Sequence, residues 1–229
     1  MKIILTIVLL FFGFIPGSLA QTSILEIDLA SLEDALQGNP EDARLNNSMG
    51  LALIKTKHYQ KSIPYLKKTI LIDPENADSH YYIALAYGAL GKHKEKLASL
   101  NETIRLEPKH APANFKLGLA HAAMNRHQEA MLYYKTAVKS EPYFSEAHYF
   151  LAVSLYMSKR YKEAAGPIRD ALQIEPKRGE YHYLLGLVNI KLGQYEEAID
   201  PLEMALKLNP NILEDGLVPN PSQTARAIN

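Results

Sequence analysis

The chain has 229 residues, of which 47% are hydrophobic and 22% are charged, with 25 basic and 25 acidic side chains. This composition excludes a disordered chain and provides enough apolar residues for a core. The formal net charge of zero lacks the basic excess that a nucleic-acid-binding surface needs, so no nucleic-acid partner is expected. The absence of cysteine excludes disulfides, a thiolate nucleophile and a zinc–thiolate site.

Residues 1–20 have the layout of a cleavable secretory signal peptide. Lys2 gives a short basic start, residues 3–15 are almost entirely apolar, and small residues precede an expected cleavage site after Ala20. The apolar run of about thirteen residues is short for a membrane span, which needs roughly twenty. An uncleaved membrane anchor is the alternative, whereas Gln21 in place of cysteine argues against a bacterial lipoprotein. We therefore expect an exported protein, periplasmic in a bacterium or else secreted, with no membrane span once the signal is removed.

Six prolines recur at a constant interval of 34 residues: Pro40, Pro74, Pro108, Pro142, Pro176 and Pro210. Such a period indicates tandem structural repeats, which decide the fold before any local motif does. Five full units follow from it: 43–76, 77–110, 111–144, 145–178 and 179–212. Positions in a unit are numbered from 1 to 34 below, so that the recurring proline stands at position 32.

Each unit predicts two helices joined by a short turn. Apolar residues recur at helical spacing at positions 7 and 11, and again at positions 20, 24, 27 and 28. Between them, positions 14–16 hold Gly or Asn in three units, and both residue types take the left-handed conformation at a helix end. The residue before each recurring proline is expected to end the second helix, because proline forces its predecessor out of the helical region. Position 8 is small, which lets the two helices of a unit approach closely.

These columns resemble the tetratricopeptide repeat, and the segment GQYEEAIDPLEMALKLNP (193–210) is similar to the second helix of that family. The resemblance implies an all-α, right-handed superhelical solenoid of five helix-turn-helix repeats over residues 43–212. Residues 24–40 resemble a further second helix without its first helix, so residues 21–42 are expected to form an N-terminal half-repeat that caps the array. Lys96 departs from the pattern at position 20, where a small residue is expected. Three prolines lie a turn inside second helices and are expected to bend them: Pro64, Pro167 and Pro201.

The end of the chain shows no sustained apolar period of its own. Residues 213–229 are expected to be a disordered C-terminal tail. Four apolar residues are candidates to fold back over the last helix: Ile212, Leu213, Leu217 and Val218. If they do not, the last helix exposes an apolar stripe to a partner or to a second copy of the chain.

By the resemblance, the first helices line the concave side of the array, and positions 5, 9 and 12 face that groove. Position 5 is mostly aromatic and position 9 is aliphatic, a combination that suits an apolar or amphipathic peptide. The predicted peptide-binding residues are Asn47, Leu51, Tyr81, Leu85, Phe115, Leu119, Tyr149, Val153, Tyr156, Tyr183 and Leu187. The alternative is that these side chains pack mainly between neighbouring first helices. The Lys and Asn set with which some family members clamp a peptide's terminal carboxylate is absent from positions 5, 6 and 9, where only Lys116 is basic.

The eight histidines fall mostly into repeat positions rather than into one cluster. His80, His148 and His182 share position 4 with two asparagines. Residues one repeat apart stand on helices whose axes lie about 10 Å apart, while zinc needs nitrogens at about 2.1 Å, so no metal is expected. No other cofactor is expected either. No fingerprint such as GxSxG, HExxH or a P-loop occurs, so we do not expect an enzyme.

The sequence therefore favours a non-enzymatic scaffold that binds a partner peptide or helix in the groove. By the resemblance, exported members of this family act in envelope or secretion assembly, so a protein partner there is expected. Two alternatives stay open. One is a structural element that self-associates through its C-terminal end, and the other is an accessory subunit of an envelope enzyme complex.

Overall fold

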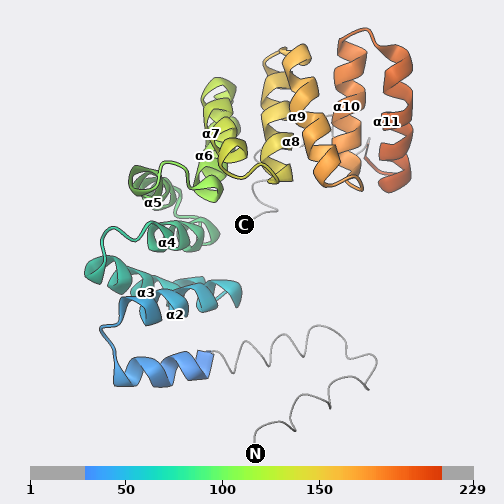
Figure 1. Cartoon of the computed structure of the whole chain (residues 1–229). Helices are drawn as coiled ribbons and strands as arrows, with labels where there is room; N and C mark the ends of the chain where they lie inside the picture. Colours follow the sequence, from blue (N-terminus) through green and yellow to red (C-terminus); the bar gives the residue numbers. More distant parts are fainter. Residues whose placement is uncertain (1–28, 213–229) are drawn as a thin grey trace, which may run out of the picture. The chain divides into compact units, whose positions relative to one another are not determined.

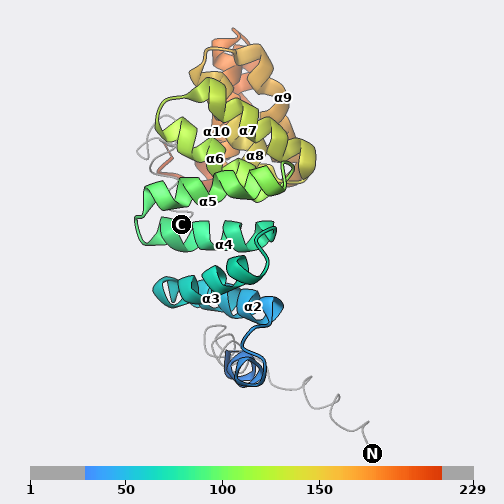
Figure 2. The same ribbon diagram turned by 90° about the vertical axis from the view of Figure 1, so that its left-hand side faces the viewer.

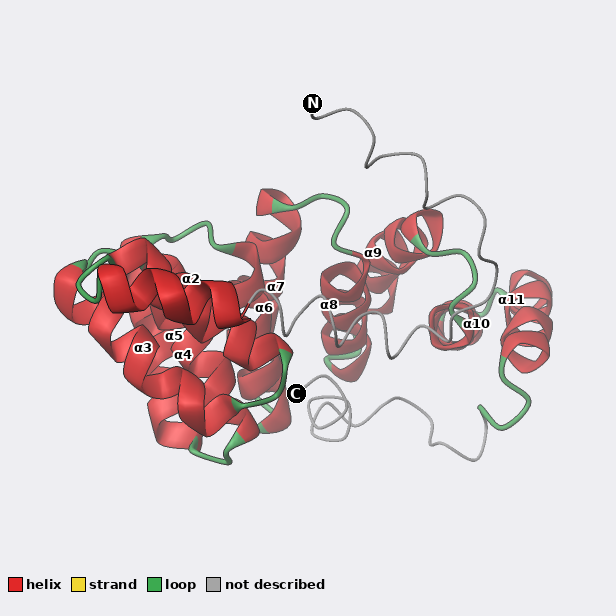
Figure 3. Ribbon diagram, turned by 90° about the horizontal axis from the view of Figure 1, so that it is seen from below, coloured by secondary structure: helices red, strands yellow, loops and turns green. Residues whose placement is uncertain are grey.

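The computed structural model describes residues 29–212, and every regular element in that range is a helix (Figure 3). The predicted signal peptide and the predicted disordered tail lie outside the described residues. A short helix over residues 29–38 comes first. Ten further helices follow: α2 (Ala43–Lys55), α3 (Tyr59–Ile72), α4 (Ala77–Ala89), α5 (His93–Leu106), α6 (Ala111–Ala123), α7 (His127–Ser140), α8 (Ser145–Met157), α9 (Tyr161–Ile174), α10 (Gly179–Lys191) and α11 (Tyr195–Leu208).

The ten helices form five pairs, and each pair lies within one predicted repeat. The first helices begin at residues 43, 77, 111, 145 and 179, so the 34-residue period of the sequence is also the period of the structure. The second helices end just before the recurring prolines, at caps with extended or bridging dihedrals such as Glu141 (φ −127°, ψ 90°). These pairs, with no strand among the described residues, confirm the prediction of an all-α helical-repeat solenoid.

The chain divides into two compact units, residues 1–86 and 87–229, with the boundary inside α4. The described part of unit 1 holds helix 29–38, α2, α3 and most of α4. Unit 2 holds the last turn of α4 and the helices α5 to α11. Within unit 2, the pairs α6–α7, α8–α9 and α10–α11 follow one another side by side (Figures 1 and 2).

Every first helix is followed by a left-handed residue at position 15. The five residues are Lys57, Gly91, Asn125, Lys159 and Gly193, with φ between 58° and 76°. The amide of the next residue donates to the carbonyl five residues back, for example from Arg160 to Leu155 at 2.9 Å, and this bond closes the helix end. The sequence predicts this conformation at the Gly and Asn positions. Its presence at two lysines, where it is disfavoured, shows that the packing of the helix pair imposes it.

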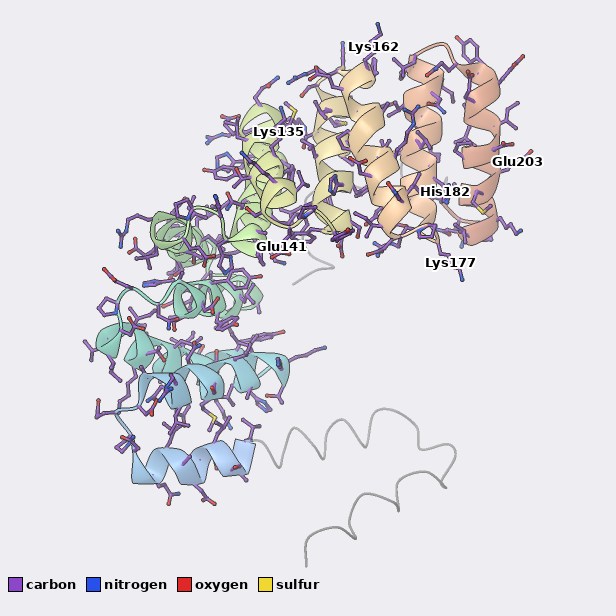
Figure 4. All side chains as sticks on the ribbon, in the orientation of Figure 1. Lys135, Glu141, Lys162, Lys177, His182 and Glu203 are labelled. Carbon is purple, nitrogen blue, oxygen red and sulfur yellow. The ribbon has the colours of Figure 1, made fainter. Side chains whose placement is uncertain are left out.

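Position 4 ties each first helix to the proline that precedes it. In all five repeats a side-chain nitrogen donates to the carbonyl oxygen of the proline six residues earlier: Asn46 to Pro40 (2.9 Å), His80 to Pro74 (3.3 Å), Asn114 to Pro108 (3.0 Å), His148 to Pro142 (3.0 Å) and His182 to Pro176 (2.8 Å). Figure 4 shows His182 in the first turn of α10, near the loop that carries Lys177. Three histidines therefore have a structural role. In residues 29–212, no group of three His, Asp or Glu side chains could hold a metal ion.

The small residue at position 8 faces the large residue at position 24 of the same pair. A Cβ atom added to Gly118 would lie 2.4 Å from Cε1 of Tyr134, and one added to Gly50 would lie 2.5 Å from Cδ2 of Leu66. Real Cβ atoms do not come so close to a neighbour. Glycine therefore sets the close spacing of α2 with α3 and of α6 with α7.

The helix over residues 29–38 lies against the first pair. Its Leu29 and Glu33 line a hollow together with Met49 and Leu53 of α2 and Tyr65 of α3. The three prolines inside second helices do not interrupt them, because α3, α9 and α11 each continue through their proline.

Candidate functional site

In unit 1, the predicted peptide-binding residues Asn47, Leu51, Tyr81 and Leu85 are all half-buried. They lie on the first helices α2 and α4. The Oδ1 atom of Asn47 accepts a hydrogen bond of 3.0 Å from Oγ of Ser79, which links the two helices. Each of the four side chains keeps part of its surface exposed, where a partner can cover it.

In unit 2, most of the predicted peptide-binding residues are buried. Five of them are at most 6% exposed: Phe115, Leu119, Tyr149, Val153 and Tyr183. Tyr156 on α8 and Leu187 on α10 are half-buried. The first helices α6 and α8 are enclosed almost all round, whereas their second helices α7 and α9 bury only one face.

The aromatic residues at position 5 belong to a cluster that joins consecutive first helices. The ring of Phe115 lies 4.8 Å from that of Phe144 and 5.7 Å from that of Phe150. The ring of Tyr149 stacks on that of Tyr181 at 4.7 Å. Burial raises the pKa of Tyr149 well above its ordinary value, and the nearby carboxylate of Glu180 raises it further. These contacts hold α6, α8 and α10 together, and they enclose the rings.

Tyr183 is covered from another direction. Its side chain packs with Ala205 of α11 and with Ile212, which is itself buried after the last helix. Of the four residues predicted to fold back over the last helix, Ile212 thus does so. Leu213, Leu217 and Val218 lie outside the described residues.

For Phe115, Leu119, Tyr149, Val153 and Tyr183, the structure therefore replaces the predicted groove role by packing. The physical reason is that the rings at position 5 meet side chains of the neighbouring first helix, of the turn before it or of the chain end. Leu119 and Val153 belong to the same buried cluster as Phe115 and Tyr149. The remaining six predicted residues keep exposed surface: Asn47, Leu51, Tyr81, Leu85, Tyr156 and Leu187. Contact between these six and a peptide stays a prediction.

The sequence analysis does not identify the partners of this aromatic cluster. Phe144, Phe150 and Tyr181 stand at positions 34, 6 and 3, which are not aromatic in every repeat. Comparing the same position across the five repeats therefore does not single out these three residues. A signal was available in the local excess of aromatic residues over 143–150, where four of the eight residues are aromatic.

The last second helix, α11, exposes an apolar stripe. At position 21, Met131 on α7 and Ala165 on α9 are only 2% and 7% exposed, because α7 and α9 pack against the next first helix. Ile199 stands at the same position on α11 and is 53% exposed. Tyr195 and Leu206 are also exposed and lie on the same helix face by their spacing.

None of the helices in the described part of the chain is long and apolar enough to cross a membrane.

Three family models match the chain. Two are tetratricopeptide-repeat models, which match residues 43–76 and 83–143, and the third describes anaphase-promoting complex, cyclosome, subunit 3, and matches residues 123–205. A search of curated protein sequences finds no significant match.

Solved structures similar to this chain are helical-repeat proteins. YrrB, described as a TPR protein with an unusual peptide-binding site, is 18% identical, with a TM-score of 0.68 over 80% of this chain and 94% of YrrB. MamA from Desulfovibrio magneticus RS-1 is 17% identical, with a TM-score of 0.63 over 74% of this chain and 96% of MamA. Another MamA structure is 19% identical, with a TM-score of 0.63 over 76% and 96% of the two chains. At these identities the structural similarity shows the fold alone. The two tetratricopeptide-repeat models, over residues 43–76 and 83–143, and the five helix pairs at a 34-residue period identify a tetratricopeptide-repeat protein.

Proposed function

We propose that this chain is a non-enzymatic scaffold that binds a partner peptide or helix through its first helices. The tetratricopeptide-repeat fold supports a protein-interaction role. The observation that carries the proposal is the half-buried state of Leu51, Tyr81 and Leu85 on α2 and α4. Apolar side chains that remain partly hydrated gain free energy when a peptide or an amphipathic helix covers them.

We place this activity outside the cytoplasm, in the periplasm of a bacterium, and in envelope or secretion assembly. The support is the signal-peptide layout of residues 1–20. The expected mature chain begins at Gln21. Mass spectrometry of the protein from its native cells would give this N-terminus, and a mass that includes residues 1–20 in a membrane fraction would contradict the cleavage.

The binding proposal is tested by photo-crosslinking in cells with a benzophenone amino acid at Leu51 or Leu85. We expect a defined adduct with another protein from both positions. A matched control carries the same amino acid at Leu71, on the second helix α3, which is 81% exposed. If Leu71 gives the same adducts as Leu51 and Leu85, the first helices are not the binding face.

A loss-of-binding test complements the crosslinking. The combined substitutions Leu51→Ser, Tyr81→Ser and Leu85→Ser remove the apolar surface in unit 1, and circular dichroism checks that the chain remains helical. We expect the crosslinked partner to be lost in co-purification with the folded variant and retained with Leu71→Ser. A folded triple variant that retains the partner would refute the proposal.

A second candidate function is self-association through α11, which its exposed stripe favours. A neighbouring copy that covers Tyr195, Ile199 and Leu206 would restore the burial that position 21 has on α7 and α9. Light scattering of the chain from Gln21 onward tests this candidate. We expect a concentration-dependent dimer that Ile199→Ser with Leu206→Ser abolishes and that Leu132→Ser on α7 leaves unchanged. A monomer at all concentrations would exclude it.

A further inference from the structure

The exposed stripe on α11, formed by Tyr195, Ile199 and Leu206, lies on a helix face that is covered in the two preceding pairs. Val138 on α7 and Leu172 on α9 stand at position 28, as Leu206 does, and both pack against the apolar core of unit 2. A first helix follows α7 and α9 and packs on each of them, whereas none follows α11 within residues 29–212. The stripe is therefore a place for a helix that the described part of this chain does not provide.

The sequence after Ile212 lacks the pattern of a further first helix. Position 4 provides a side-chain donor to the recurring proline in all five repeats, and Gly216, which has no such donor, stands at position 4 of a sixth unit. Pro219 stands at position 7, where a helix interior would lose a hydrogen bond and meet the proline ring. A helix that covers the α11 stripe is therefore expected to come from another molecule.

One edge of the α11 stripe is acidic. Glu196 and Glu203 stand three residues before and four residues after Ile199, so both lie beside it on the helix surface. Both side chains are exposed, and Figure 4 shows Glu203 on the side of α11 that faces away from α10. A helix that covers the stripe therefore meets negative charge along one side.

This acidic edge is confined to the last repeat. Glu196 stands at position 18, which holds Gln or Lys in the other four repeats, and Glu203 stands at position 25, which holds Lys, Arg or Asn. On α9 the same two positions are Lys162 and Arg169, and both are exposed. The charge is therefore reversed on the same helix whose apolar face is uncovered.

The edge selects the charge of the occupant. Apolar side chains on a covering helix gain free energy on the stripe whatever their origin. Lysine or arginine beside them would attract Glu196 and Glu203, whereas further carboxylates would be repelled.

A second copy of α11 meets this condition poorly. An antiparallel contact between two α11 helices sets the same edge of each against the other, because the contact uses one patch twice. That edge carries three carboxylates, Glu196, Asp200 and Glu203, and one ammonium group, that of Lys207. Like charges therefore prevail across such a contact.

We propose that the α11 stripe and its acidic edge form a docking surface for a basic amphipathic helix of another protein. The helix lies where a sixth first helix would pack, with its apolar face on the stripe and its basic residues beside Glu196 and Glu203. This surface is separate from the first-helix surface of the proposed function. It competes with the second candidate function, which places a second copy on the same stripe, and the experiment separates the two.

The test measures the binding of two synthetic peptides to the chain from Gln21 onward. Each peptide has about 15 residues, blocked ends, leucine at helical spacing along one face and a single tryptophan. One peptide carries lysine at its polar positions, and the other carries glutamate there. The chain has no tryptophan, so the emission of the peptide reports binding directly. We expect the lysine peptide to bind with a shift of its emission to shorter wavelength, and the glutamate peptide to bind more weakly by about tenfold. Equal binding of the two peptides, or no binding of either, would overturn the proposal.

A charge reversal makes the test specific to this edge. Glu196→Lys with Glu203→Lys should invert the preference, so that the glutamate peptide binds more tightly than the lysine peptide by about tenfold. The matched control is Glu95→Lys with Glu129→Lys, which changes the net charge equally at exposed positions of α5 and α7 and should keep the preference for lysine. If the control inverts the preference as well, the peptides respond only to net charge and the proposal is wrong.

The apolar part of the surface is tested separately. Ile199→Ser with Leu206→Ser should weaken binding of the lysine peptide by about tenfold or more. Leu132→Ser on α7, where the leucine is also exposed, should leave binding unchanged. Circular dichroism checks that each variant remains helical, and an equal loss of binding in both variants would contradict docking on α11.

Two results would assign the stripe to another occupant and overturn the proposal. If the combined substitutions Leu213→Ser, Leu217→Ser and Val218→Ser tighten binding of the lysine peptide about tenfold, the chain's own C-terminal segment occupies the stripe. If light scattering shows a dimer that Ile199→Ser with Leu206→Ser dissociates and that the lysine peptide does not, a second copy occupies it. Neither result changes the crosslinking expected from the first helices, so the proposed function is judged separately.

Discussion

The Nε2 atom of His148 lies 3.0 Å from the carbonyl oxygen of Pro142, six residues earlier in the chain. One repeat earlier, the side-chain nitrogen Nδ2 of Asn114 donates an equivalent hydrogen bond of 3.0 Å to the carbonyl oxygen of Pro108. Two different types of side chain therefore make the same hydrogen bond, which fastens the start of a first helix to the turn between repeats.

Replacing His148 tests this role. His148→Asn should keep the bond and change the free energy of unfolding little, whereas His148→Ala should lower it by about 1 kcal/mol. Urea unfolding followed by circular dichroism measures both. If asparagine is as harmful as alanine, the bond to Pro142 is not what position 4 provides.

The buried ring of Tyr149 gives a second prediction. Tyr149→Ala removes the stacking on Tyr181 and leaves a cavity, so it should lower the free energy of unfolding by about 3 kcal/mol. The Tyr149 hydroxyl is buried without a hydrogen-bond partner. Tyr149→Phe should therefore be neutral or stabilising, by up to about 1 kcal/mol. Thermal melts of the two variants compare them, and a destabilised phenylalanine variant would show that the hydroxyl has a partner after all.

Two glycines in helices should respond to alanine in opposite directions. Gly118→Ala places a Cβ atom against the ring of Tyr134, which is buried and has no space to move, so it should destabilise the chain by about 2 kcal/mol. Gly38→Ala meets no atom within 4 Å at the end of helix 29–38 and should stabilise the chain by about 0.5–1 kcal/mol. Equal effects of the two substitutions in melting experiments would contradict the close packing of α6 on α7.

The left-handed residues after the first helices give a fourth prediction. Lys159 has φ 59° and an exposed side chain, so Lys159→Gly should stabilise the chain by about 1 kcal/mol through relief of backbone strain. Gly193 has φ 76°, and Gly193→Ala should destabilise it by a similar amount of about 1 kcal/mol. Guanidinium unfolding of the pair measures both signs. A destabilising glycine at 159 would show that Lys159 makes a contribution besides its backbone conformation.

The lowered pKa of Lys116 makes stability depend on pH. In the unfolded chain the amine keeps its ordinary pKa of 10.5, and in the folded chain the pKa is about 8. Between these values the unfolded chain binds more protons, so the free energy of unfolding rises with pH. From about pH 7.5 to about pH 9.5 we expect a gain of about 2 kcal/mol, which Lys116→Met should lack. The difference between the two chains isolates this residue from the other groups that titrate.

The repeat register and the helix pairs were predictable from the sequence because they depend on local signals. The 34-residue proline period, the apolar spacing and the small residue at position 8 recur in every unit, and the helices lie where these columns place them. The left-handed turn was predictable at Gly91, Asn125 and Gly193 for the same reason.

The candidate site was only partly predictable, because burial depends on side chains from other repeats. A helical wheel predicts that Phe115, Tyr149 and Tyr183 leave the core of their own pair. It does not include Phe144 and Phe150, Tyr181, or Ile212, which cover those three rings from neighbouring helices or from the chain end. The exposed stripe on α11 is likewise an effect of position in the array, since no first helix follows α11 within residues 29–212 to cover Ile199.

Lys96 shows most clearly which properties the sequence determines and which depend on the tertiary structure. By itself the sequence determined that a lysine stands where a small residue is expected, as a departure from the repeat pattern. Only the tertiary structure decided what surrounds this lysine, because the bare backbone of Gly88 lies against its stem. The helical period is set within one segment of chain by the geometry of its own backbone, whereas the surroundings of a side chain are set by segments that meet only after folding.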